Sequence, residues 1–96
     1  MRLTILRDAP GRTVPDAETL ALAALGWVLG DAPRAERLLS LTGLTPEELR
    51  GGLDDRWVLS AVLDFLAAHE PDLVAAAEAL QVEPAVLVGA ARELSA

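Results

Sequence analysis

The chain of 96 residues has no cysteine and no lysine, and aromatic side chains make up only 3% of it. Without cysteine it can form neither a disulfide scaffold nor a thiolate metal site. Eight arginines stand against fifteen acidic residues, so the net charge is −7. A chain with this charge and no lysine lacks the basic surface of a protein that wraps nucleic acid, and we expect no nucleic-acid partner.

Long apolar runs are also absent. The apolar stretch Leu20–Gly30 has about half of the roughly 20 residues that a membrane helix needs. The apolar part of the first residues is too short for a signal peptide, because Arg7 and Asp8 interrupt it. We therefore expect a soluble cytoplasmic protein with no membrane contact.

Apolar residues nevertheless make up 52% of the chain, too many for a disordered acidic tail. They recur at the i, i+3, i+4, i+7 spacing of amphipathic helices. This pattern predicts an all-α fold, a small orthogonal bundle of five to six short helices in a single domain over residues 14–96. Leu3 and Ile5 alternate with polar residues ahead of the Pro10-Gly11 break, so residues 1–13 are predicted to be a separate segment, extended or flexible.

Capping residues and helix breakers place the helix boundaries. Thr45 and Glu48 have the spacing of a capping box, and Gly51-Gly52 ends the short helix that they open. The same spacing of Thr13 and Asp16 opens the first helix. Capping also explains the acidic pairs Glu47-Glu48 and Asp54-Asp55 without any carboxylate chemistry. The remaining predicted helices cover about 14–29, 32–42, 56–69, 72–81 and 84–94.

An internal repeat links two of the predicted helix junctions. Leu41–Gly51 and Ala79–Gly89 match in register, with Pro46 opposite Pro84 at an offset of 38 residues. Each stretch has a helix end, an apolar anchor, a proline that opens the next helix, and a glycine, which predicts two helix-turn-helix-like corners. A DNA reader needs cations along the second helix, and these helices offer acids or a single arginine. Packing is thus the preferred interpretation, with a nucleic-acid-binding helix-turn-helix protein as an alternative.

Residues that could carry chemistry are few. His69 is the only histidine. It is predicted to lie at the end of the helix over residues 56–69 and to extend the inward stripe of that helix. Asp64 falls on the solvated stripe with Ser60, off the face of His69, so a small enzyme around His69 and Asp64 is the weakest alternative. No metal-ligand spacing such as His-x3-His occurs. We predict no catalytic residue, no metal and no cofactor.

The first helix has two apolar faces, which points to an interface. We expect central burial of this helix first and a partner on its second face next. The two tryptophans are predicted core anchors, or interface hot spots if they are exposed. The predicted function is a non-enzymatic protein–protein interaction module, acting with another protein or as a homo-oligomer through an apolar face of helix one or helix four ringed by acids. The candidate interface residues are Leu22, Leu25, Leu29, Trp27 and Trp57.

Three strings carry a family resemblance: RLLSLTGLTPEELR (Arg37–Arg50), AVLDFLAAHE (Ala61–Glu70) and the tail VEPAVLVGAARELSA. With them, residues 16–94 resemble a small bacterial family, mainly alphaproteobacterial, called domain of unknown function 3572. TGLTP and AVLDFL are the most specific parts, and MRLTILRDAPGR has no counterpart. The resemblance implies an all-helical domain, and it implies no activity, cofactor or catalytic residue.

Overall fold

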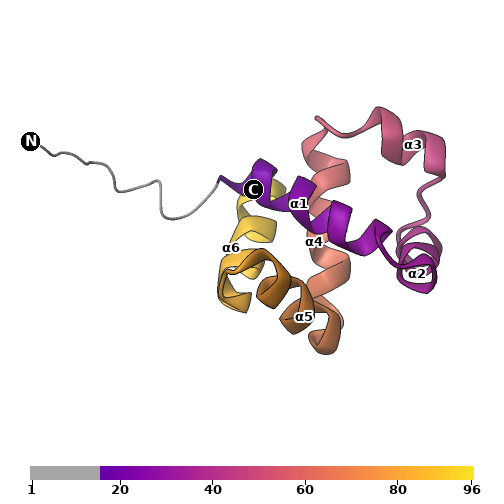
Figure 1. Ribbon diagram of the computed structural model, residues 1–96. Helices are drawn as coiled ribbons and strands as arrows, with labels where there is room; N and C mark the ends of the chain where they lie inside the picture. Colours follow the sequence, from indigo (N-terminus) through magenta and orange to yellow (C-terminus); the bar gives the residue numbers. More distant parts are fainter. Residues whose placement is uncertain (1–15) are drawn as a thin grey trace, which may run out of the picture.

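Six α-helices and no strand occupy residues 16–96, the part of the chain that the computed structural model describes (Figure 1). The predicted all-α fold is therefore confirmed. The predictions of a separate segment at residues 1–13 and of a cap at Thr13 lie outside the described residues. The helices are α1 (Ala17–Leu29), α2 (Ala32–Thr42), α3 (Pro46–Gly51), α4 (Arg56–Ala67), α5 (Glu70–Leu80) and α6 (Pro84–Ser95).

Capping residues begin the helices close to where the sequence predicts them. The side chain of Asp16 accepts a hydrogen bond from the Thr19 N–H at 2.7 Å, so α1 begins at Ala17 rather than at residue 14. The predicted capping box is confirmed, because the Glu48 N–H donates to Thr45 Oγ1 at 3.0 Å and the Thr45 N–H donates to Glu48 Oε1 at 2.9 Å. α2 has the predicted bounds and is capped by Asp31.

The boundary between α4 and α5 differs from the prediction. α4 ends at Ala67, two residues short, and α5 begins at Glu70 rather than at residue 72. Pro71 does not delay α5, because the missing N–H of a proline in the first helical turn has no intrahelical partner to lose. His69 is thereby the N-cap residue of α5 and not the last residue of α4.

The repeated corners have the same backbone course. The C-cap residues are Gly43 for α2 and Gln81 for α5, and both have a positive φ, of 77° and 61°. An apolar residue turned toward the core follows, Leu44 in one corner and Val82 in the other. An extended N-cap residue and a proline then open α3 and α6. α5 and α6 meet at 102°, which gives the bundle its orthogonal form.

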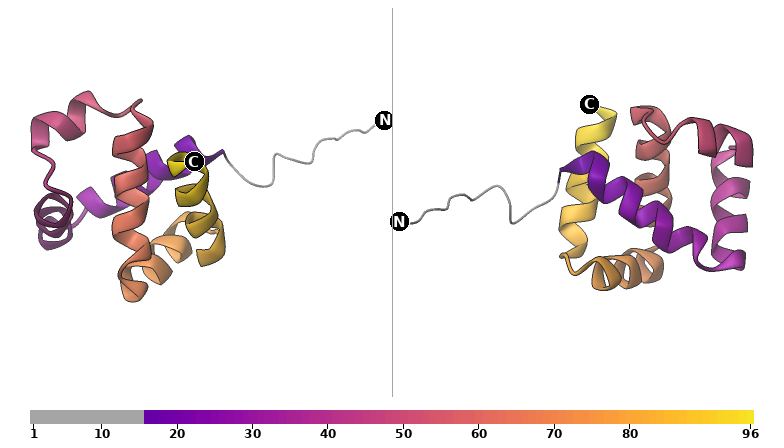
Figure 2. Two further views of the ribbon diagram at one scale, coloured as in Figure 1. Left: turned by 180° about the vertical axis from the view of Figure 1, so that it is seen from behind. Right: turned by 45° about the horizontal axis from the view of Figure 1, so that its top comes forward.

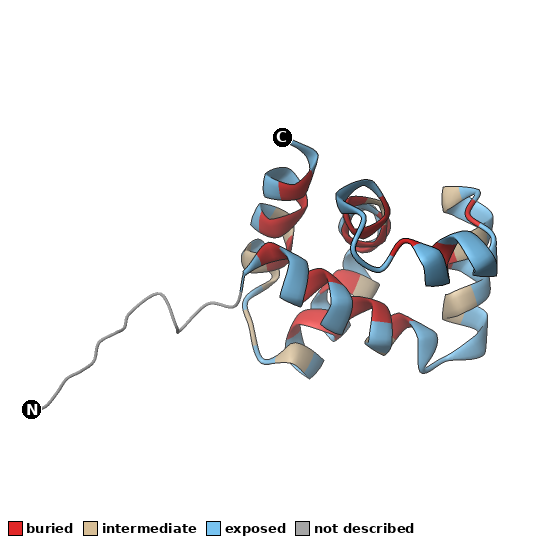
Figure 3. Ribbon diagram, turned by 90° about the horizontal axis from the view of Figure 1, so that it is seen from above, coloured by how far each residue is buried: buried red, intermediate tan, exposed pale blue. Residues whose placement is uncertain are grey.

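α4 is the most enclosed helix, and this corrects the prediction that helix one lies at the centre. Figure 2 shows α1 running diagonally across one side of the bundle, over α6, α4 and α2. Only the inward stripe of α1 is buried (Figure 3). Along α4, by contrast, Leu59 and Leu63 are buried in addition to the predicted stripe, because α1, α2, α5 and α6 all pack against it.

Among the described residues, no helix by itself combines the length and the apolar composition that a membrane crossing requires. α5 and α6 reach that length only when they are taken together across their 102° bend. Both helices contribute buried residues to the core, including Leu73, Ala76, Leu87 and Leu94. The apolar character of the pair is thus explained by packing within the domain.

Candidate functional site

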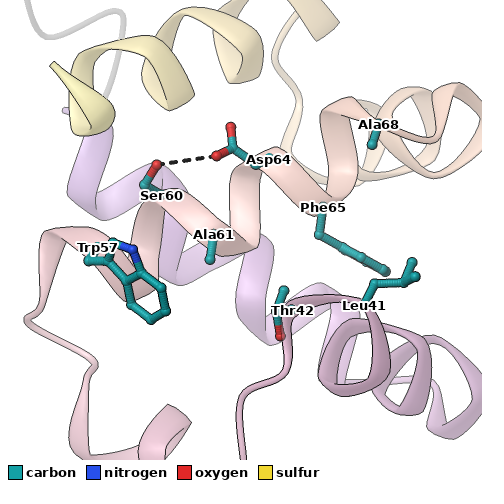
Figure 4. A pocket seen from close by; sticks show the side chains of 8 residues that line it. All are labelled: Leu41, Thr42, Trp57, Ser60, Ala61, Asp64, Phe65 and Ala68. Atoms are coloured by element: carbon teal, nitrogen blue, oxygen red, sulfur yellow. Dashed lines mark hydrogen bonds between the residues drawn. The ribbon is translucent and has the colours of Figure 1, made fainter.

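A hollow lies on α4, on the side away from α1, between α4 and the C-terminal end of α2 (Figure 4). Its volume is about 460 Å³. We call it the α2–α4 groove. Its lining residues are Leu41, Thr42, Trp57, Ser60, Ala61, Asp64, Phe65 and Ala68.

Two large apolar side chains stand at the edges of the groove. Trp57, in the first turn of α4, has 66% of its surface exposed, and Leu41, near the end of α2, has 73% exposed. Figure 4 shows Trp57 at one end and Leu41 beside Phe65 at the other, with Ala61 between them. The small side chain of Ala61 leaves the middle of the hollow open. The result is an apolar floor between two apolar walls that contact solvent.

The polar groups of the groove lie along one rim. Ser60 Oγ donates to Asp64 Oδ2 at 3.5 Å, one helical turn apart (Figure 4). Asp64 is exposed, as predicted, whereas Ser60 is buried and does not share a solvated stripe with it. Asp64 forms no ion pair with an arginine of the described residues. The rim therefore presents a carboxylate next to an apolar floor.

A smaller hollow of about 280 Å³ adjoins the groove and shares Trp57 with it. Glu48 and Asp55, which cap α3 and α4, line this hollow. Its floor needs glycine at position 52, since a Cβ atom there would lie 2.5 Å from Val58 Cγ2. Trp57 thus stands between two hollows that both have carboxylates at their edges.

An ionic cluster lies near the Phe65 end of the groove. Arg37, from α2, pairs with Asp72 in the first turn of α5, and His69 Nδ1 lies 3.1 Å from the same carboxylate. The Arg37 guanidinium also lies 5.9 Å from the centre of the Phe65 ring. His69 is exposed, so its predicted place on the inward stripe of helix four is wrong. It lies beside Asp72 as the N-cap residue of α5.

The candidate interface residues fall into three environments. Leu25 is only 4% exposed and belongs to the core, so it offers nothing to a partner. Leu22 and Leu29 are 42% and 49% exposed on the outer face of α1. Trp27 is partly buried and covered by Arg34, whose guanidinium carbon lies 3.6 Å from the ring centre and which also donates to the Trp27 carbonyl. Trp57 is exposed and is the only member of the predicted set in the groove.

The two residues of the enzyme alternative are not brought together. Asp64 lines the groove and accepts from Ser60, while His69 contacts Asp72 and does not line either hollow. No group of three or more metal-ligating side chains occurs within residues 16–96. The groove can bind an apolar surface, and it does not place Asp64 and His69 where a proton could pass between them.

Sequence reasoning missed Leu41, the most exposed large apolar residue of the described chain. A signal was present. The inward stripe of the second helix contains Leu38 and Leu39, and Leu41 is an apolar residue that falls outside this stripe. A single exposed apolar side chain is common on protein surfaces, but a contiguous apolar patch marks a contact surface, and Leu41 lines the same groove as Trp57.

The profile of a protein family described as "Protein of unknown function (DUF3572)" matches residues 14–96. The chain belongs to this family. The predicted resemblance to DUF3572 is therefore confirmed, and residues 1–13 lie outside the matched range. No curated protein and no solved structure matches the chain.

The two strings that carry the DUF3572 resemblance both contribute to the α2–α4 groove. TGLTP supplies Thr42, and AVLDFL supplies Ala61, Asp64 and Phe65. The same strings also hold the first corner and the middle of α4 in place, through the capping box at Thr45 and the buried Val62 and Leu63. In this DUF3572 domain, fold and groove are thus built from the same segments.

Proposed function

We propose that this domain is a non-enzymatic protein–protein interaction module that binds a helix-forming segment of another protein in the α2–α4 groove. The observation that carries the proposal is the exposure of Trp57 and Leu41 on either side of an apolar floor. Exposed aromatic side chains beside apolar pockets are typical hot spots of protein interfaces. The sequence suggests an apolar face of helix one or of helix four as the interface, and the proposal places it on helix four.

The dimensions of the groove suit a helix. The floor follows α4 from Trp57 to Ala68, a rise of about 17 Å at 1.5 Å per residue. A partner helix of about three turns covers this length, with side chains at i, i+3, i+4 and i+7 facing the floor. A small molecule fits less well, because sites for small molecules enclose most of the ligand, and both walls here are largely exposed.

The competing function classes have less support. A DNA-reading helix presents basic side chains at its N-terminal end, but α3 has Glu47 and Glu48 in its first turn. The inward face of α6 is buried in the core, and its one arginine, Arg92, is in the last turn. An active site would bring a base and a second polar group to one reacting atom, and the contacts of Asp64 and His69 go to different partners.

The proposal is tested by selecting binders from a displayed library of helical peptides. Each peptide has about 16 residues, with apolar residues fixed at i, i+3, i+4 and i+7 and all other positions varied. The full chain is the target. We expect the selected peptides to bind the wild type and to lose about tenfold or more in affinity for Trp57→Ser, because this substitution removes an aromatic wall.

The matched control is Leu29→Ser, which removes a similarly exposed apolar side chain from α1, outside the groove. Peptide affinity for this variant should stay within about twofold of wild type. Selected peptides that bind Trp57→Ser as tightly as wild type would place the interface elsewhere, and a library that yields no binder would contradict the proposed function.

A further inference from the structure

We infer that the partner helix carries basic residues beside its apolar stripe, and that these residues lie toward the Trp57 end of the groove. The inference rests on the proposed function and adds the chemistry of the partner. The described domain is strongly acidic. Residues 16–96 contain five arginines against fourteen aspartates and glutamates.

Four of the five arginines of the described domain contact its own groups. Arg34 donates to the Trp27 carbonyl, Arg37 pairs with Asp72, and Arg56 donates to the Glu93 carbonyl at 2.8 Å. Arg50 lies 4.0 Å from Glu47. None of the five lines the α2–α4 groove or the hollow beside it. The lining that a bound helix meets there is apolar, hydroxyl or acidic, and it includes no arginine of the described residues.

The acids are distributed unevenly around the groove. Asp64 lies on its rim, and Glu48 and Asp55 line the hollow that shares Trp57. At the opposite end, Arg37 lies over Phe65 and offsets the charge of Asp72. The Trp57 end is consequently the more negative one. Lysine or arginine near this end of the partner gains attraction to Glu48 and Asp55, and a basic residue in the middle of the partner gains attraction to Asp64. Acids at these positions are repelled.

A second copy of the same chain is a poorer occupant, since each copy has a net charge of −7 and would bring acids against acids. A basic amphipathic helix of another protein satisfies both the apolar floor and the acidic edges. Such attraction raises the association rate and weakens with added salt.

The test uses three synthetic peptides with one leucine stripe and with lysine, glutamine or glutamate at the flanking positions. Their affinities for the full chain are measured by titration at low and at high salt. We expect the lysine peptide to bind about tenfold more tightly than the glutamate peptide at low salt, with glutamine in between. At about 1 M salt, where the Debye length is about 3 Å, the three affinities should converge.

Variants that remove single carboxylate charges show which acids attract the lysine peptide. Asp64→Asn, Glu48→Gln and Asp55→Asn each keep a polar group, and glutamine and asparagine can still serve as caps. Each should weaken the lysine peptide by about twofold to fivefold and leave the glutamine peptide unchanged. Glu78→Gln, an exposed acid of α5 outside both hollows, is the control and should change neither affinity.

The outcomes separate the two proposals. Three peptides that bind equally, in a manner lost in Trp57→Ser, would overturn the basic partner and leave the interaction groove standing. Peptides that do not bind at all would overturn both. A concentration-dependent dimer of the full chain that Trp57→Ser abolishes in sedimentation would also overturn the inference, because the occupant would then be a second copy.

Discussion

Gln81 has an unusual backbone conformation for its residue type. Its φ of 61° lies in the left-handed region, where the Cβ atom of an L-residue crowds the backbone, and it is the only non-glycine residue with a positive φ in residues 16–96. Gly43 occupies the equivalent position of the other corner without this cost. Both corners therefore need a left-handed residue at the same position of the repeat, and only the second corner has a strained residue there.

The replacement Gln81→Gly should stabilise the domain. Relief of left-handed strain exceeds the extra entropy of glycine in the unfolded chain, so we expect a gain of about 0.5–1 kcal/mol in the free energy of unfolding. Denaturant unfolding followed by circular dichroism measures it. The reciprocal Gly43→Ala should lose a similar amount, and because nothing lies within 4 Å of the added Cβ, that loss is conformational and not steric. If Gln81→Gly leaves the free energy of unfolding unchanged or lowers it, Gln81 is not strained.

Side-chain exposure is where sequence reasoning about single residues failed most often. Leu22, Leu25 and Leu29 share a residue type and a helix, yet Leu25 is buried and its neighbours are exposed. Helical periodicity groups the three leucines on one face, but it cannot decide how much of that face the neighbouring helices cover. Ser60 is the opposite case, a polar residue buried because α4 is enclosed on nearly all sides.

At the scale of the element, the start of α1 is sensitive to pH. Hydrogen bonds from Thr19, first from its side chain and then from its backbone N–H, lower the pKa of Asp16 below its ordinary value of 3.8. The ionised carboxylate is therefore favoured in the folded state. Its stabilisation is complete above pH 3.8 and is lost as the pH falls through the lowered pKa.

The variant Asp16→Ala tests this dependence. We expect it to be less stable than wild type at pH 7, and the difference in unfolding free energy to narrow as the pH falls below about 3.8. Thermal melts of both proteins across this pH range provide the measurement. Asp16→Asn, which keeps a capping oxygen that does not titrate, should not show this pH-dependent loss. A difference between wild type and Asp16→Ala that is constant with pH would contradict the role of the charge.

Helix existence and most boundaries were predictable because caps and breakers act locally. The box at Thr45, the glycines after α3 and the proline before α6 each fix a boundary within a few residues. The start of α5 was not predictable in this way, since a proline is compatible with several positions around a helix N-terminus. The central place of α4 depends on contacts between distant segments, which no local signal contains.

At the scale of the whole molecule, the groove results from the way in which short helices cover α4. α1 crosses one side of α4 and α6 packs beside it, while α2 contacts α4 and lines the groove with Leu41 and Thr42 at its C-terminal end. α3 is too short to close the remaining space. The lining of the groove could therefore not be predicted from any one helix, even though both of its exposed walls, Leu41 and Trp57, were visible in the sequence as large apolar residues.

Two glutamate substitutions on α1 distinguish its buried face from its exposed outer face. Leu25→Glu places a carboxylate in the core and should cost more than about 3 kcal/mol of unfolding free energy. Leu22→Glu, on the exposed outer face, should change that free energy by less than about 0.5 kcal/mol and should leave the elution volume and the binding of selected peptides unchanged. Denaturant unfolding, size-exclusion chromatography and peptide titration measure these quantities. If Leu22→Glu stays folded but loses peptide binding or alters the elution volume, the contact surface is the outer face of α1 and not the groove, because Leu22 lies outside both hollows beside α4.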